Sequence, residues 1–257
     1  MKTVRACAFG LSLGWAMLPA SATTLTTIGV AYTQDFNSLA TTGSSSVLPT
    51  GWAFNETGTS ANTTYGTGTG SSTTGDTYSF GNSADRAFGT LLSGTLVPTI
   101  GASFINNTGA TISSITISYT GEQWRLGATG REDRLEFSYS TNATSLTSGS
   151  WIDDASLNFI APVTAGTVGL LDGNLSANRT AISGTITGLS ISNGSEFWLR
   201  WSDFNATGSD DGLGIDDFSL TPYATAVRHN APDGLSALVP FALVLALLAT
   251  RRRVCAG

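Results

Sequence analysis

The sequence predicts an all-β protein: an antiparallel β-sandwich of jelly-roll-like architecture in residues 23–223. Apolar and polar side chains alternate with a period of two in several segments, as in strands with one buried face. β-branched and aromatic residues fill most of the apolar positions. Clusters of Gly and Asn separate these segments, and no stretch between them has a helical period. This pattern favours a sandwich over an α/β fold.

The clearest strand is expected at 196–203, where the apolar side chains point one way while Trp198 and Arg200 point the other. Residues 112–120 and 133–140 repeat the alternation. The full set of expected strands is 30–36, 77–81, 85–92, 99–105, 112–120, 133–140, 151–159, 179–187, 196–203 and 213–221.

One long segment is expected to lie outside the strands. Residues 55–77 are a low-complexity run of Thr, Gly and Ser. The run is too long for a tight turn, so we predict a flexible surface loop.

The chain begins with the features of a secretory signal peptide, predicted to cover residues 1–22. Lys2 and Arg5 provide a positive start, an apolar stretch follows, and small residues precede a predicted cut after Ala22. The protein is therefore expected to be exported.

The chain ends with a motif, an apolar segment and a basic cluster. A linker and sorting motif are assigned to residues 224–234, with Pro232, Asp233 and Gly234 as the motif. Residues 235–250 are predicted to form a short transmembrane helix, marginal for a bilayer that needs about 20 residues. The tail 251–257 opens with Arg251, Arg252 and Arg253, which the positive-inside rule keeps in the cytoplasm.

This three-part ending resembles the PEP-CTERM class of bacterial sorting signals and its VPDSG-like relatives. The departures are the leading Ala231 and the residues that follow the arginines. The resemblance implies an exosortase-like processing enzyme as a partner and transient anchoring in the inner membrane. It implies a final location at the cell surface, in the outer membrane or in the extracellular matrix.

Charge and cysteine content exclude several classes of function. Residues 23–223 carry six arginines, no lysine and 17 carboxylates, a formal charge of −11. So acidic a surface argues against nucleic acid as a partner. Both cysteines, Cys7 and Cys255, lie outside this span, so no disulfide is expected in it. The single histidine, His229, is also outside it, which excludes a Ser-His-Asp triad there.

A calcium site is one candidate. Residues 203–212 place oxygen-bearing side chains at alternate positions around a glycine, and Ca²⁺ prefers such hard ligands. The ligands predicted are Asp203, Asn205, Asp210 and Asp216. The alternative is a solvated acidic loop with Asx-turns.

A glycan-binding face is the second candidate. Glu122, Trp124 and Arg125 stand at a strand end, where an aromatic ring could stack on a sugar while the polar groups bind its hydroxyls. Trp198 and Arg200 could extend that face. The alternative is a tryptophan in the sandwich core with an arginine at its rim.

The segments 119–125, 197–203 and 212–220 together resemble an uncharacterised extracellular domain. It occurs in bacterial surface proteins and beside extracellular nuclease domains. The last segment, with its Ile-Asp-Asp-Phe sequence, is similar to the final strand of MAM-type and carbohydrate-binding jelly rolls. The resemblance implies a fold and a location.

The predicted function is structural or adhesive, at a surface or in a matrix of exopolysaccharide or biofilm. A carbohydrate-binding module is the first alternative. A glycoside hydrolase is the second, because it needs only a suitably placed carboxylate pair. We expect no enzyme, since the sequence contains no nucleophile elbow, metal-histidine motif or phosphate loop.

Overall fold

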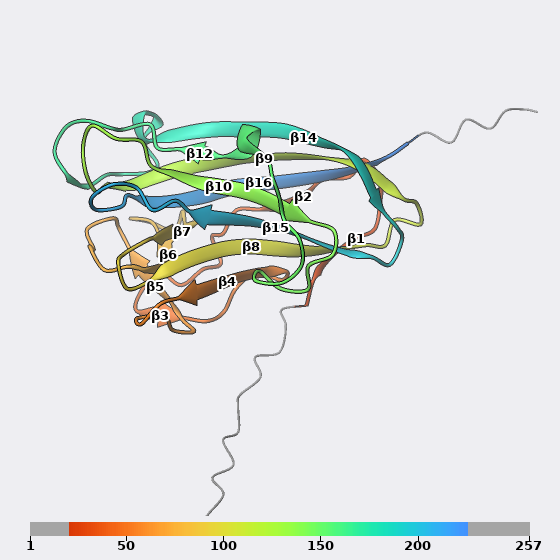
Figure 1. Ribbon diagram of the computed structural model, residues 1–257, viewed down its shortest axis with the longest axis horizontal. Helices are drawn as coiled ribbons and strands as arrows, with labels where there is room; N and C mark the ends of the chain where they lie inside the picture. Colours follow the sequence, from red (N-terminus) through yellow and green to blue (C-terminus); the bar gives the residue numbers. More distant parts are fainter. Residues whose placement is uncertain (1–20, 226–257) are drawn as a thin grey trace, which may run out of the picture. The chain divides into compact units, whose positions relative to one another are not determined.

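Two β-sheets pack face to face across residues 21–225, which are the residues that the computed structural model describes. The first, seven-stranded sheet has the order β1-β8-β15-β10-β11, with β4 also beside β8 and β12 beside β10. Its strands are β1 (Thr23–Leu25), β4 (Trp52–Thr57), β8 (Val97–Asn106), β10 (Arg134–Ser140), β11 (Ile152–Asp153), β12 (Phe159–Ile160) and β15 (Glu196–Asp203). In Figure 1, β10, β15, β8 and β4 follow one another in this order.

The second, nine-stranded sheet has the order β13-β9-β16-β7-β6-β5-β3, with β14 also beside β9 and β2 beside β16. Its strands are β2 (Tyr32–Gln34), β3 (Ser44–Ser45), β5 (Tyr65–Gly68), β6 (Asp76–Phe80), β7 (Ala87–Leu91), β9 (Ile112–Leu126), β13 (Gly169–Leu170), β14 (Arg179–Ile191) and β16 (Gly212–Ala224). Two 3₁₀ turns, η1 (Ala155–Leu157) and η2 (Ser176–Asn178), complete the described elements.

Aromatic side chains from both sheets form the core between them. Trp201 stacks on Trp52 at a centroid distance of 6.0 Å. Across the interface it meets the edges of Tyr119 at 5.4 Å and Phe218 at 5.9 Å. Such rings bury large apolar areas, so this cluster joins the two layers into one sandwich. The all-β, two-sheet prediction is confirmed.

Most predicted strands are present in the structure. One predicted strand and one predicted loop differ from it. The expected strand at 151–159 is broken into β11, η1 and β12. The predicted flexible loop 55–77 is wrong, because it contains β5, whose Tyr65 is fully buried. The Tyr65 hydroxyl donates to the carbonyl of Val47 at 2.9 Å and accepts from the amide of Ala40 at 3.1 Å.

The glycines of β5 explain why the sequence pattern does not predict this strand. A Cβ on Gly68 would lie 3.1 Å from the ring of Tyr78 in the neighbouring strand, so this ring takes the space of the missing side chain. The strand therefore packs without the β-branched residues that normally mark one.

No helix within residues 21–225 is both long enough and apolar enough to cross a membrane. Residues 1–20 of the predicted signal peptide, the sorting motif, the transmembrane segment 235–250 and the basic tail lie outside the described residues.

Candidate functional site

The predicted glycan-binding residues Glu122, Trp124 and Arg125 lie together near the end of β9, but Trp124 is only 1% exposed. Its indole stacks on Phe80 at 6.1 Å, and its Nε1 donates to Glu122 Oε2 at 3.0 Å. A Cβ on Gly173 would lie 2.5 Å from the indole, so a neighbouring loop covers the ring. The predicted stacking surface is therefore wrong, because alternation along a strand does not reveal which loops cover its face.

Glu122 and Asp216 hold protons near neutral pH. Burial raises the pKa of Glu122 to about 7, and the charge of Asp85 adds to the rise. Burial also raises the pKa of Asp216 to about 8, with a further contribution from the charge of Glu122. Beside them β16 changes register, and Asp217 there adopts a φ of 49°. The Ile-Asp-Asp-Phe sequence is thus a β-bulge in which Asp216 is buried and Asp217 is exposed.

The four predicted calcium ligands do not form one site. Within residues 21–225, no three carboxylate, imidazole or thiol groups converge closely enough to hold a metal ion. The charges acting on Asp203 are those of Asp133 and Asp210, whereas Asp216 faces the charge of Glu122. Asp203 and Asp216 belong to different acidic groups, although the sequence places them 13 residues apart.

Asp203 and Asp210 belong to what we call the acidic cluster, which also contains Asp133, Asp211 and Arg131. Arg131 Nη1 lies 3.0 Å from Asp133 Oδ2, and Nη2 lies 3.1 Å from Asp211 Oδ1. The Asp211 amide donates to Asp133 Oδ2 at 2.7 Å, which joins the loop before β10 to the loop before β16. All four carboxyl groups are buried, and Arg131 is the cation within the cluster.

Asp203 is the least compensated member of the acidic cluster. The Thr90 hydroxyl and the Leu92 amide lie close enough to lower the pKa of Asp203. Among the described residues, neither makes a hydrogen bond of ordinary geometry to its carboxylate oxygens. Burial, followed by the charge of Asp133, raises the pKa of Asp203 well above its ordinary value. Both effects favour the protonated form of Asp203.

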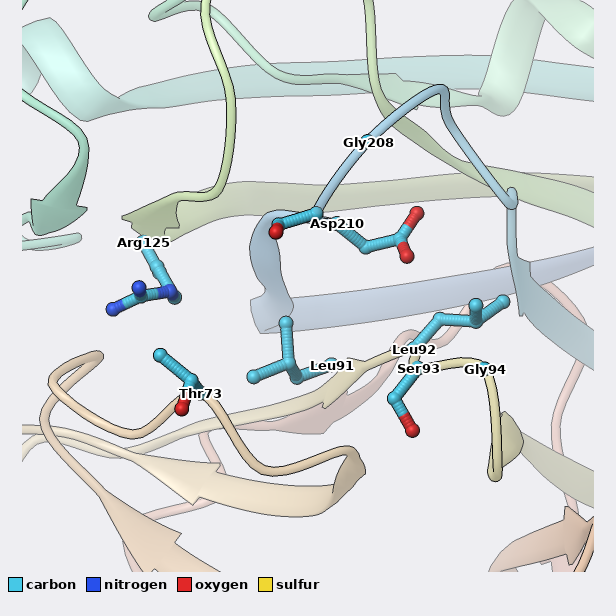
Figure 2. Close-up of a pocket in the computed structure, with 9 residues that line it drawn as sticks. Thr73, Leu91, Leu92, Ser93, Gly94, Arg125, Gly208 and Asp210 are labelled. Atoms are coloured by element: carbon cyan, nitrogen blue, oxygen red, sulfur yellow. The ribbon is translucent and has the colours of Figure 1, made fainter.

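A small pocket of about 200 Å³ lies beside the acidic cluster. Figure 2 shows Arg125 and Thr73 at one end, Ser93 at the other and Leu91 between them, with Asp210 on a neighbouring loop. The Arg125 guanidinium donates to the carbonyl of Gly70 at 3.2 Å. The pocket therefore brings together one residue from each predicted site, but the arginine serves to hold a loop.

The larger hollow is a groove of about 700 Å³ on the first sheet, which we call the β4 groove. It runs along β4, at the edge of the sheet, and is closed on the other side by the loop 143–147. Its polar lining includes the hydroxyls of Ser46, Thr50, Thr63, Thr144, Ser145 and Thr147 and the amides of Asn55 and Asn62. Its apolar lining includes Leu48, Pro49, Phe54, Leu146 and Trp198.

Trp198 forms part of this groove on the outer face of the first sheet. It packs against Ala143 and Leu146 in a cluster separate from the main core. Arg200, next along the same face, donates from Nη1 to the Leu146 carbonyl at 3.0 Å, and its guanidinium lies 4.0 Å from the Trp151 ring centroid. The predicted opposition of Trp198 and Arg200 to the buried face of β15 is confirmed.

Sequence reasoning missed β4 and hence the groove. Residues 52–54 have no predicted element, and residues 55–57 fall in the predicted loop. Yet Trp52 and Phe54 alternate with Ala53 and Asn55, as in a strand. That alternation was the available signal. The loop 143–147 carries no comparable pattern, because its place over β15 depends on long-range packing.

The fold and these sites define a two-sheet β-sandwich with an open polar groove. No protein-family model matches the chain, and no curated protein matches it. Among solved structures, TmCBM61 in complex with β-1,4-galactotriose is 9% identical, with a TM-score of 0.33 over 66% of this chain and 88% of that one.

Two further solved structures are similar at the same level. The enzymatically active domain of bacteriophage CBA120 tailspike protein 4 is 10% identical, with a TM-score of 0.35 over 67% of this chain and 19% of that one. A cleaved adhesin domain of Lys-gingipain from Porphyromonas gingivalis is 11% identical, with a TM-score of 0.33 over 53% of this chain and 74% of that one. The likeness is too distant to assign a function.

Proposed function

We propose that this protein is a non-catalytic, adhesive β-sandwich that binds polysaccharide in the β4 groove. The observation that carries the proposal is the groove itself, whose lining combines apolar side chains with hydroxyl and amide groups. Sugars present apolar C–H faces and hydroxyl rims, so a site for them needs both kinds of surface. The sandwich rigidly supports the groove because β4 pairs with β8 over its whole length.

The ligand class is a neutral glycan. The groove lining contains no cationic side chain to pair with uronate or sulfate groups. Its one carboxylate, Glu56, is occupied: Oε1 accepts from the amide and hydroxyl of Thr77, both at 2.9 Å, and Oε2 accepts from the Asn62 amide at 3.0 Å. Glu56 therefore fixes the shape of the groove.

The strand order supports the jelly-roll assignment. β8, β15 and β10 are neighbours in the first sheet, and β14, β9, β16 and β7 are neighbours in the second. The chain changes sheet at each step from β7 to β10 and from β14 to β16.

A non-catalytic role is supported by the surroundings of two glutamates, Glu122 and Glu136. Glu122 is 1% exposed and bonded to Trp124. Glu136 pairs with Arg134 at 2.7 Å on the outer surface. Hydrolysis of a glycosidic bond needs two carboxyl groups facing one substrate. Release of reducing ends from a glycan panel by the purified protein would contradict the proposal.

Removing polar side chains from the groove should weaken binding of polysaccharide. We expect the double variant Asn55→Ala, Thr63→Ala to lose about tenfold in affinity for a neutral polysaccharide, because two hydrogen-bonding groups that line the groove are lost. Affinity electrophoresis in gels containing xylan, glucomannan or galactan measures this loss. Thr185→Ala, on the exposed part of β14, is the control and should bind as the wild type does. Equal binding by all three proteins would place the glycan elsewhere.

Export and C-terminal sorting belong to the proposed function. The signal-peptide pattern of residues 1–22 supports export, and β1 begins at Thr23, directly after the predicted cut. Loss of residues 1–22 would therefore leave every described strand whole. Mass spectrometry of surface-exposed copies from the source cells should find Thr23 as the first residue and no peptide from 235–257. An intact tail on most surface copies would contradict processing by an exosortase-like enzyme.

A further inference from the structure

Trp198 has an unused hydrogen-bond donor beneath the β4 groove. The side chain is 4% exposed, and among the described residues its indole N–H meets no acceptor. A buried N–H without a partner is unfavourable unless another state of the molecule or a ligand satisfies it. Because Trp198 lines the groove, this donor lies next to the proposed ligand rather than in the main core.

The loop 141–151 lies over Trp198 and is largely held by its own hydrogen bonds. The Thr144 and Ser145 amides both donate to the Ser148 hydroxyl at 2.9 Å. The Trp151 indole donates to the Ser148 carbonyl at 2.8 Å. The two ends of the loop are adjacent, because β10 and β11, which flank it, pair as antiparallel neighbours. Such a loop can move as a unit about its two ends.

The contacts between this loop and the sheet centre on Trp198 and Arg200. Leu146 and Ala143 pack on the Trp198 ring, and Arg200 Nη1 donates to the Leu146 carbonyl at 3.0 Å. Arg200 is itself positioned from the other side, since its Nε donates to the Ser138 hydroxyl at 3.0 Å. With the loop lifted, Arg200 would keep its hydrogen bond to Ser138 and lose its contacts with the Leu146 carbonyl and the Trp151 ring. The Trp198 ring would then be exposed.

We infer that the loop 141–151 is a movable cover, and that Trp198 beneath it is the residue that recognises a sugar ring in the β4 groove. The inference rests on the proposed function. With the loop displaced, the indole face stacks on the C–H face of a sugar residue, and the indole N–H donates to a hydroxyl oxygen of the same residue. The ligand thus satisfies the donor that the closed state leaves unpaired, and it replaces the apolar contact with Leu146.

With a cover of this kind, the apparent association constant equals that of the open form multiplied by the fraction of molecules that are open. A substitution that weakens the closed state should therefore strengthen binding, which is the opposite of what a fixed wall predicts. Leu146→Ala removes the main contact of the cover, whereas Trp198→Phe keeps an aromatic ring and removes the donor.

The test is isothermal titration of the wild type and both variants with cellohexaose, xylohexaose and mannohexaose. Hydrogen exchange of residues 141–151 is measured in parallel on the same proteins. For the probe that the wild type binds best, we expect Leu146→Ala to bind up to about fivefold more tightly. We expect Trp198→Phe to bind about tenfold more weakly. Exchange in 141–151 should be faster in Leu146→Ala than in the wild type, with β10 unchanged.

The outcomes separate this inference from the proposed function. If the wild type binds and Leu146→Ala is weakened as Asn55→Ala, Thr63→Ala is, the loop is a fixed wall and the cover is rejected. If Trp198→Phe binds as the wild type does, Trp198 is outside the sugar site. Failure of the folded wild type to bind any of these three probes, or xylan, glucomannan or galactan in the affinity gels, would reject the proposed function and, with it, the sugar site at Trp198.

Discussion

Replacing Arg131 by alanine is expected to lower the free energy of unfolding by about 3–5 kcal/mol at pH 7.5, because two buried carboxylates lose their cation. Arg131 lies 3.0 Å from Asp133 and 3.1 Å from Asp211. Asp133 is fully buried and Asp211 is 2% exposed, so water cannot replace the lost charge. Urea denaturation followed by tryptophan fluorescence measures the change.

Arg134→Ala is the matched control for this variant. Arg134 pairs with Glu132 at 3.4 Å and with Glu136 at 2.7 Å, and these partners are 54% and 46% exposed. Exposed pairs of this kind contribute at most about 1 kcal/mol. Equal losses of stability in the two arginine variants would contradict the account of the acidic cluster.

The penalty for Arg131→Ala should also depend on pH. Burial already raises the pKa of Asp211 to about 6 and raises that of Asp133. Without Arg131 both groups should bind protons in the folded state at still higher pH. The loss of stability is therefore expected to be largest at pH 7.5 and to shrink toward pH 5.

Asp203→Asn is expected to be more stable than the wild type at pH 7.5 and similar to it at pH 4.5. The pKa of Asp203 is well above its ordinary value in the folded state, so unfolding at a pH between the unfolded-state and folded-state values releases a proton. Stability from this group is then present at low pH. It falls by up to about 1.4 kcal/mol per pH unit as the pH rises toward the folded-state pKa. Asparagine has no such titration, so the variant should lose this slope.

Urea denaturation of both proteins at pH 4.5, 6 and 7.5 measures the difference in slope. Glu122 and Asp216 titrate in both proteins, so their contributions cancel in the comparison. A variant less stable than the wild type at all three pH values would show that the fold needs a charged carboxylate at position 203. If that loss appeared only with millimolar Ca²⁺ present, it would favour the calcium interpretation of residues 203–216.

The sequence predicts strands well where alternation is unbroken and poorly where glycine replaces the apolar residue. β15 begins and ends at the predicted residues because Phe197, Leu199 and Trp201 alternate without interruption. β5 escapes prediction because Gly66 and Gly68 leave room for a neighbouring aromatic ring. The β-propensity of a segment does not show that a side chain from a neighbouring strand packs against its glycines.

Alternation also predicts which face a side chain occupies without predicting what covers it. Trp124 and Trp198 both lie on outer faces, yet a loop near Gly173 seals Trp124 into a cluster with Phe80. Trp198 instead lies under the loop 141–151, beside the groove. For the same reason the sequence does not predict that Asp203 lies near Asp133, because the two are 70 residues apart.

The most direct test of the β4 groove is hydrogen exchange of the protein with and without its best-binding neutral polysaccharide. Binding in the groove should slow exchange in residues 52–57. It should leave residues 114–118 and 183–187, on the opposite sheet, unchanged. Protection confined to the second sheet, or to the pocket between Arg125 and Asp210, would contradict the assignment of the groove as the glycan site.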